Sequence, residues 1–302
     1  MRKSRKAAFG AAGIGLALLL SACQLGGSST EEKGTITVGV SASFTENVLV
    51  AEMYAQILEA NGFTVERQLE LGSREVSQPA LEKGEIEVKP EYLATLLLFY
   101  DQDATDISTP EGVEAQLAPI LADKGVTLLE FSNAVDTNAI VVTQKTADDR
   151  ELTKTSDLAP LAGELIFGGP PECPTRPFCI PGLESTYGIT FKEFKPLDVG
   201  GPLTVAALEE GAVDVALLFS TNGLIARKGF VVLEDDKNLQ AADFIAPVVN
   251  SDALTDELED LLDSVSAVLT TENITELIAR VDADGEDEAD VAKSFLEDND
   301  LI

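Results

Sequence analysis

The chain has 302 residues, 45% of them hydrophobic, and its 53 acidic residues against 21 lysines and arginines give a formal net charge of −32. A surface this acidic repels nucleic acid and anionic lipid, so we expect no nucleic-acid partner. Histidine is absent, which excludes Ser-His-Asp and Cys-His catalysis and the usual zinc sites. The sequence also lacks a Gly-x-Ser-x-Gly elbow and a phosphate-binding loop. We therefore predict that the protein is no enzyme and has no cofactor and no metal site.

The N-terminus has the anatomy of a secretory signal. Four of the first six residues are cations, residues 7–20 carry no charge, and Leu-Ser-Ala leads into Cys23. This apolar run of 14 residues is shorter than the ~20 that a bilayer span needs. Its end resembles the bacterial lipobox, in which the cysteine is acylated and becomes the new N-terminus. The alternative is an ordinary cleaved signal with an incidental cysteine.

We predict a lipoprotein signal peptide over residues 1–22, a lipid on Cys23 and a flexible Gly/Ser-rich tether over 23–34. The protein would then be exported and held by its lipid on the outer face of the cytoplasmic membrane, or in a periplasm.

Beyond the tether, the apolar pattern alternates between strand-like and helix-like segments, which is typical of an α/β fold. Thr45 can cap the first helix, and Pro90 is expected to open the helix that contains Tyr92. The predicted strands cover residues 35–40, 63–70, 86–88, 126–131, 138–143, 165–167, 213–219 and 230–233. The predicted helices cover residues 46–60, 77–83, 90–99, 111–124, 182–187, 204–210, 253–269, 272–281 and 288–297.

The alternation starts anew near residue 138, which predicts two lobes, each a central sheet flanked by helices. Candidate hinge crossings lie near 136–138 and 219–221. We assign residues 35–137 and 220–302 to lobe 1 and residues 138–219 to lobe 2.

Lobe 2 contains the two remaining cysteines, Cys173 and Cys179, in a proline-rich loop. An exported protein meets an oxidising compartment, where an even pair of cysteines close in sequence indicates a disulfide. Two thiols alone supply too few ligands for a metal site. We predict this disulfide, with a pair of free thiols as the alternative.

Five short motifs follow one another along the chain: SASFTE at 41–46, LEKGEIE at 81–87, PEYLAT at 90–95, ALEEGAVDV at 207–215 and FSTNG at 219–223. Together they resemble the substrate-binding proteins of ABC importers for glycine betaine, choline and related osmoprotectants, from residue 34 to the C-terminus. The resemblance implies a type II periplasmic-binding-protein fold, whose two lobes close on a ligand in the cleft. It also implies a monomeric receptor whose partners are a small-molecule solute and the permease and ATPase subunits of an importer.

A quaternary ammonium has no hydrogen-bond donor and is held by aromatic faces, whereas a ligand carboxylate is held by arginine or N–H groups. Residues 91–95 are similar to the family's Glu-Tyr-Thr-Gly-Thr segment. The resemblance therefore implies Tyr92 as a cage residue and Thr95 as a polar contact. The alternative for Tyr92 is packing under its helix. Arg74 is a candidate partner for a ligand carboxylate, or else a solvated surface arginine.

Further candidate ligand residues lie at turns and crossings. Strand-to-helix turns at the carboxyl ends of strands bind ligands in open α/β folds. This makes Phe44, Thr45 and Asn47 candidates, with simple capping as the alternative for Thr45. Asp136 can supply a negative charge for a cation, or cap a turn. The candidate set is completed by Asn138, Thr204 and Phe219.

The chain departs from the family pattern at several of these positions. Many relatives have a tyrosine after Asn-Thr where this chain has Asn138, and some have a tyrosine where it has Thr204. At the second crossing it has Phe219, and Asn222 replaces the usual aspartate. With four tyrosines in the chain, the usual positions cannot supply a full tyrosine cage.

We therefore predict an extracytoplasmic solute-binding lipoprotein that delivers a glycine betaine-like or choline-like osmoprotectant to an ABC permease. Because the tyrosine cage is incomplete, the same receptor role for a different small polar solute is the alternative. A surface scaffold lipoprotein is a further one.

Overall fold

The structure, a computed structural model, describes residues 33–40, 44–107, 109–241 and 243–302. The predicted signal peptide, Cys23 and most of the predicted tether lie outside the described residues. Among the described residues, no helix is both long enough and apolar enough to cross a bilayer.

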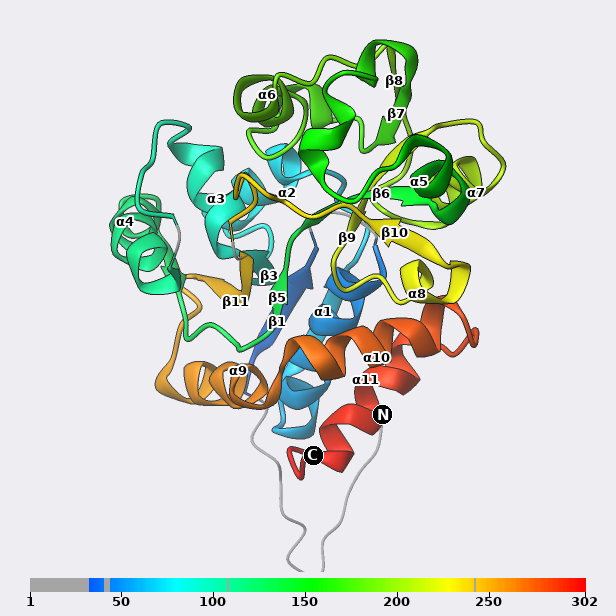
Figure 1. Ribbon diagram of the computed structural model, residues 1–302. Coiled ribbons are helices and arrows are strands. Elements are labelled where there is room, and N and C mark those ends of the chain that lie inside the picture. The colour runs from blue at the N-terminus through cyan, green and yellow to red at the C-terminus, as the bar shows by residue number, and fades with distance from the viewer. Residues whose placement is uncertain (1–32, 41–43, 108, 242) are drawn as a thin grey trace, which may run out of the picture. The chain divides into compact units, whose positions relative to one another are not determined.

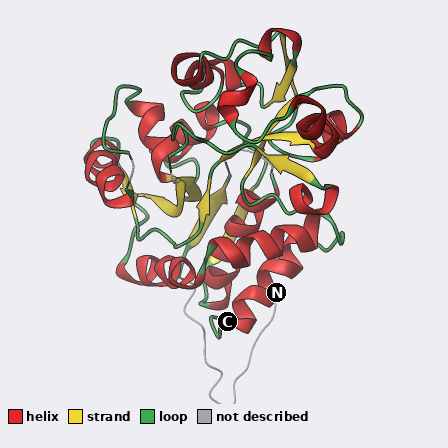
Figure 2. Ribbon diagram, in the orientation of Figure 1, coloured by secondary structure: helices red, strands yellow, loops and turns green. Residues whose placement is uncertain are grey.

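The first sheet combines parallel and antiparallel strands; strands are drawn as yellow arrows in Figure 2. Its strands β1 and β2 run parallel, as do β1 and β3, whereas β11 is antiparallel to its neighbours β3, β4 and β5. Strand order across the sheet is β2 (Thr64–Gln68), β1 (Thr35–Gly39), β3 (Val88–Tyr92), β11 (Asp243–Asn250) and β4 (Val126–Leu128), with β5 (Val135–Asp136) also paired to β11.

Helices cover both faces of this sheet (Figure 1). One face packs against α1 (Thr45–Ala60), α9 (Asp256–Val268), α10 (Thr271–Asp282) and α11 (Glu288–Asp298). The other face packs against α2 (Arg74–Glu82), α3 (Leu93–Tyr100) and α4 (Pro110–Ala122). Side chains alternate along each strand, so Ile245 and Val249 of β11 join the first core, and Ala246 and Val248 join the second. We call this sheet and its helices the first lobe.

The second sheet makes up the second lobe. Its strand order is β10 (Phe230–Val232), β6 (Asn138–Thr143), β9 (Val215–Phe219), β7 (Ile166–Gly169) and β8 (Glu193–Pro196). Its helices are α5 (Gln144–Arg150), α6 (Ile180–Gly182), α7 (Pro202–Glu209) and α8 (Leu224–Lys228), with shorter helical turns at Thr155–Leu158, Ala162–Glu164, Cys173–Thr175 and Leu183–Tyr187. Two helix-flanked sheets confirm the predicted two-lobed α/β class.

The prediction that Pro90 opens a helix is wrong. Pro90 lies inside β3, and α3 starts only after Tyr92. In the sheet Pro90 faces Pro247, whose carbonyl accepts the amide of Leu129 on its other side. Such a pair in an antiparallel ladder exchanges no hydrogen bonds, so the missing N–H of Pro90 does not weaken the pairing with β11.

The predicted end of lobe 2 at residue 219 also needs correction. The chain stays with the second sheet through β10, which pairs antiparallel with β6, and it rejoins the first sheet only at β11. The second crossing therefore lies between Val232 and Asp243 rather than at 219–221. Ser220 and Thr221 nevertheless contact the first crossing, because both donate hydrogen bonds to Asp136 on β5.

Candidate functional site

The carboxyl ends of strands from both sheets meet at one cavity of about 580 Å³. Phe44 follows β1 across the undescribed residues 41–43, Tyr92 ends β3, and Phe219 ends β9. All three line the cavity, as do Pro170 after β7 and Leu197 after β8. Ligands of open α/β folds bind at such strand ends, so this cavity between the lobes is the candidate binding site.

Three aromatic rings form a row along the cavity wall. Phe44 lies in the middle, with its ring centroid 6.1 Å from that of Tyr92 and 5.0 Å from that of Phe219. Both pairs are stacked with an interplanar angle of 27°. The first lobe supplies Tyr92 and Phe44, and the second lobe supplies Phe219. The fold thus brings together three aromatic candidates that are far apart in the sequence.

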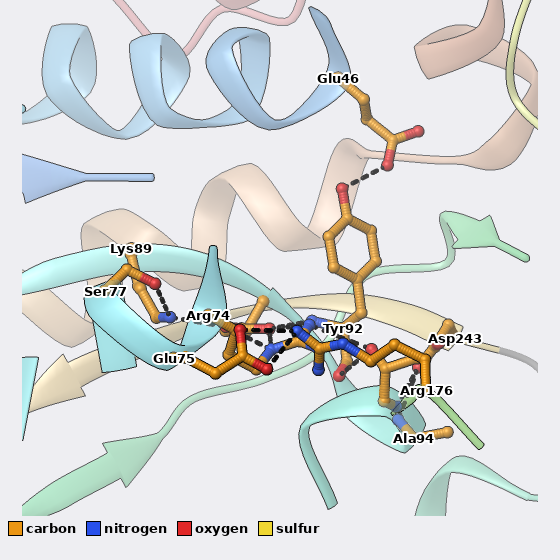
Figure 3. A network of polar contacts seen from close by, with 11 residues as sticks. Glu46, Arg74, Glu75, Ser77, Lys89, Tyr92, Ala94, Arg176 and Asp243 are labelled. Carbon is orange, nitrogen blue, oxygen red and sulfur yellow. Dashed lines mark hydrogen bonds and ion pairs between the residues drawn. The ribbon is translucent and has the colours of Figure 1, made fainter. Parts of the chain in front are cut away.

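Tyr92 has a structural and a cavity-facing role at once. Its ring is 8% exposed and packs with the core between the first sheet and α1. Its hydroxyl donates a hydrogen bond of 2.7 Å to Glu46 Oε1, as Figure 3 shows. Tyr92 ends β3 rather than standing inside a helix, and its side chain both packs against the core beneath α1 and lines the cavity.

Arg74 is largely buried, and its guanidinium group already pairs with a carboxylate of the protein. Its Nε lies 3.0 Å from both carboxylate oxygens of Glu91, and its Nη2 lies 2.6 Å from Oε2. The same Nη2 donates to Thr95 Oγ1 at 3.1 Å. Arg74 and Thr95 both line the cavity, and Figure 3 shows Arg74 below the Tyr92 ring.

Glu91 is buried between two cations. Lys89 Nζ donates to Glu91 Oε1 at 2.6 Å and to Ser77 Oγ at 3.1 Å. Burial alone would raise the pKa of Glu91, but Arg74 and Lys89 outweigh it and hold this pKa well below its usual range. Burial lowers the pKa of Lys89 to about 8, although the neighbouring Glu91 opposes that change.

Two further carboxyl groups, Glu46 and Asp136, are buried, and no cation of the described residues forms an ion pair with either. Asp136 Oδ1 accepts hydrogen bonds from Ser220 Oγ at 3.1 Å, from Thr221 Oγ1 at 3.2 Å and from Thr221 N at 3.3 Å. Burial, together with the charge of Glu46, raises the pKa of Asp136 well above its ordinary value. Burial raises the pKa of Glu46 to about 6, although the hydroxyls of Thr221 and Tyr92 favour its charged form.

Asp243 places a third carboxyl group at the cavity. It accepts hydrogen bonds from the amides of Ala94 at 2.6 Å and Thr95 at 2.9 Å, in the first turn of α3. Those amides and Arg74 favour the carboxylate, but burial outweighs them and raises the pKa of Asp243 to about 7.

The disulfide between Cys173 and Cys179 is present and confirms the predicted pairing. Both cysteines line the cavity, and the loop between them carries Arg176. Arg176 Nη2 lies 3.0 Å and 3.1 Å from the two carboxylate oxygens of Glu75 on α2. This ion pair connects the second lobe to the first lobe at the cavity wall.

Of the other candidate residues, some line the cavity and some lie outside its wall. Asn47 and Asn138 line the cavity, and Asn138 Nδ2 also donates to Phe178 O at 3.2 Å. Thr45 does not cap α1, because its hydroxyl donates to Asp282 Oδ1 at 2.5 Å and Phe44 is the N-cap residue. Thr204 is fully buried and lies outside the wall, with its hydroxyl 2.6 Å from Asp198 Oδ1.

A second, smaller cavity of about 330 Å³ adjoins the first. Phe44, Phe219 and Asp198 border both cavities. The second cavity also meets Thr45 and Glu46, so the start of α1 lies between the two spaces.

Four charged residues of this site were not among those predicted from the sequence: Glu46, Glu91, Arg176 and Asp243. The first two stand inside the SASFTE and PEYLAT motifs, next to predicted site residues. Arg176 is marked only by its place between two cysteines. The local sequence around Asp243 contains no signal that could have found it.

Comparisons with known proteins agree with this geometry. The family model of the substrate-binding domain of the ABC-type glycine betaine transport system matches residues 34–298. Glycine betaine-binding protein YehZ of Escherichia coli K12 is 26% identical over 264 residues, which cover 83% of this chain and 87% of that protein. Carnitine transport binding protein OpuCC of Listeria monocytogenes is 28% identical over 318 residues, which cover 99% of this chain and 98% of that protein.

Solved structures show the same fold. A glycine betaine/carnitine/choline ABC transporter structure superposes with a TM-score of 0.68 at 25% identity and covers 88% of this chain and 99% of its own. A choline-binding protein of an ABC transporter, solved with choline, superposes with a TM-score of 0.63 at 19% identity and covers 88% of this chain and 89% of its own. Because the family model spans nearly all of the described residues, this chain belongs to the family of substrate-binding domains of ABC-type glycine betaine transport systems.

Proposed function

We propose that this protein captures a small quaternary amine in the cavity between its lobes and delivers it to the permease and ATPase of an ABC importer. The observation that carries the proposal is the row of Tyr92, Phe44 and Phe219 beside the buried carboxyl groups of Glu46 and Asp136. Aromatic faces attract a quaternary ammonium by up to roughly 2 kcal/mol when the site is dry. Nearby carboxylates add attraction that does not require a donor on the ligand.

A thermal-shift screen tests the solute class. We expect one clear stabiliser among glycine betaine, choline, carnitine, proline betaine, ectoine and amino acids. A ligand that binds only the folded state stabilises it by RT ln(1 + [L]/Kd), which is roughly 2.7 kcal/mol at 100 times Kd. If no solute shifts the melting temperature, the receptor role fails and a scaffold role becomes the better hypothesis.

The ligands in the names of its relatives, glycine betaine and carnitine, are quaternary amines, and a different small polar solute is the second candidate. The observation that favours it is the small number of tyrosines, because only Tyr92 of the four lines the cavity. A strong thermal shift with an amino acid or ectoine, and none with any quaternary amine, would select this second candidate.

The aromatic row can be tested at Tyr92. We expect Tyr92→Ala to weaken binding of the best screened solute at least about tenfold, measured by calorimetry. Tyr100→Ala is the matched control, because Tyr100 lies outside the cavity wall and bonds instead to Glu82. Unchanged affinity with a lowered melting temperature would mean that Tyr92 only packs.

The proposal includes a lipid anchor on Cys23, with residues 23–34 as its tether. Such an anchor keeps a monomeric receptor close to its permease and raises its effective concentration there. We expect Cys23→Ala to release the protein from the membrane fraction. Immunoblots of the membrane and soluble fractions would measure this release. A Cys23→Ala protein that stays in the membrane fraction would contradict the anchor.

A further inference from the structure

Glu46 and Asp136 stand at the partition between the two cavities. Asp136 borders the larger cavity and Glu46 borders the smaller one. The stacked rings of Phe44 and Phe219 border both, so they complete the partition. A solute held against this partition in the larger cavity would meet Asp136 and the two aromatic rings, with Glu46 on the other side of the partition.

Within the part of the chain that the structure describes, the groups that contact the two carboxyl groups are neutral. Glu46 is 2% exposed and accepts from the Tyr92 hydroxyl, and Asp136 is 3% exposed and accepts from Ser220 and Thr221. The two arginines that line the larger cavity are already engaged: Arg74 pairs with Glu91 and Arg176 pairs with Glu75. A buried carboxylate without a counter-charge is expensive, and two such groups close together do not both ionise readily.

The surrounding groups add negative charge. Asp243 on β11 pairs in register with Asp136 on β5, and its own carboxyl group bonds to the start of α3. On α10, Asp282 bonds to Thr45 and borders the smaller cavity. The remaining acidic residues that border the two cavities are Glu70, Glu75, Glu172, Asp198 and Glu288. Asp136 therefore has acids on its neighbouring strand as well as on α1, and burial and Glu46 raise its pKa accordingly.

We propose that Glu46 and Asp136 form a proton-sharing carboxyl pair that selects solutes with a net positive charge and releases its proton to solvent when such a solute binds. The inference rests on the proposed function and names its ligand class more narrowly. A trimethylammonium group supplies the counter-charge that the pair lacks, so both carboxyl groups can then be ionised. A zwitterion such as glycine betaine also brings a carboxylate, which must compete with Glu91 or Glu75 for an arginine. The geometry thus favours a choline-like monocation.

Calorimetry with choline and with glycine betaine tests this. Each titration is repeated at pH 5.5 and pH 8 in buffers of different ionisation enthalpy, which reports the number of protons released. We expect choline binding at pH 5.5 to release up to one proton, and fewer at pH 8. Its Kd should rise as the pH falls, by at most tenfold per pH unit for one proton, because protonation of the pair competes with the cation. Glycine betaine should bind more weakly than choline at pH 8.

Variants locate the proton. We expect Glu46→Gln and Asp136→Asn each to abolish proton release and to weaken choline binding at pH 8 at least about tenfold. Glu52→Gln is the matched control, because Glu52 is a buried carboxylate on the same helix that already has a cation, Arg67, at 2.9 Å. On choline binding, the Glu52→Gln variant should release as many protons as the unaltered protein does.

Two outcomes overturn the inference in distinguishable ways. Choline binding without proton release at pH 5.5 in the unaltered protein, with a constant Kd from pH 5.5 to 8, overturns the carboxyl pair alone. Absence of binding by any quaternary amine at either pH overturns the proposed function, and the pair falls with it. Since both results come from the unaltered protein, they do not depend on whether a variant folds.

Discussion

Replacement of Glu91 by glutamine removes the charge that Lys89 and Arg74 both contact inside the first lobe. Lys89 is fully buried and Glu91 is 1% exposed, so solvent cannot substitute for the lost carboxylate. Removal of one partner from a buried ion pair costs about 3–5 kcal/mol. For a domain of this size that corresponds to a fall in melting temperature of about 6–20 °C.

The measurement is urea unfolding followed by circular dichroism. Glu59→Gln provides a matched control: Glu59 also pairs with an arginine, Arg67, at 2.6 Å, but its side chain is 41% exposed. Exposed pairs contribute about 0–1 kcal/mol, so this control should lose little. A Glu91→Gln loss no larger than that of Glu59→Gln would refute the reasoning.

The pH dependence gives a second readout on the same variant. Burial already lowers the pKa of Lys89 to about 8, and without Glu91 that pKa should fall further. The unfolded chain keeps its lysine proton up to about pH 10.4. Between the lower pKa of the folded protein and that pH, the unfolded chain therefore binds more protons than the folded protein. Stability of Glu91→Gln should therefore recover as the pH rises from 7 to 9. A flat profile would mean that Lys89 finds another way to keep its charge.

The remaining predictions concern other parts of the chain. Replacement of Cys173 and Cys179 by serine opens a small ring, and loop-closure entropy predicts a loss of about 2 kcal/mol, which urea unfolding with and without reductant would measure. In Gly223→Ala the new Cβ would lie 2.7 Å from Cβ of Ala279 on α10, so calorimetry should find about 1–3 kcal/mol of destabilisation. Burial raises the pKa of Asp243 to about 7, so the folded state holds this proton more tightly than the unfolded state. The ligand-free protein should consequently lose about 2 kcal/mol between pH 5.5 and 7.5, and Asp243→Asn should flatten that slope.

Local patterns predicted the elements that carry their own signal. The strand over 138–143 is confirmed without change, because six residues of mainly β-branched or apolar character lie between polar neighbours. By contrast, β11 has no counterpart among the predicted strands, although it joins β3, β4 and β5. Its sequence, DFIAPVVN, contains a proline, and proline normally argues against an inner strand. The pairing of Pro247 with Pro90 removes that objection, but only the folded sheet brings the two residues together.

The site was predictable to the extent that its residues stand in motifs. Phe44, Tyr92 and Phe219 were named from three motifs, and the cavity brings them into one row. The charged partners were not predictable in the same way. Arg74 was a candidate for a ligand carboxylate or a solvated surface arginine, whereas its partner in the structure, Glu91, lies 17 residues away, and no local period connects the two. Asp243 reaches its partners across 149 residues.

In the first lobe, the alternation of side chains along β3 separates a buried acid that pairs with cations, Glu91, from one that does not, Glu46. Glu91 and Tyr92 are consecutive in β3, so their side chains leave the sheet on opposite faces. On the face of α2, Glu91 meets Arg74 and Lys89, and its charge is balanced within the protein. On the face of α1, Tyr92 meets Glu46, which has no such balance in its contacts. Substitution of Glu91 should therefore act mainly on stability, whereas substitution of Glu46 should act mainly on binding of a cation. If both substitutions lowered stability equally and left choline affinity unchanged, the assignment of Glu91 to stability and of Glu46 to cation binding would be wrong.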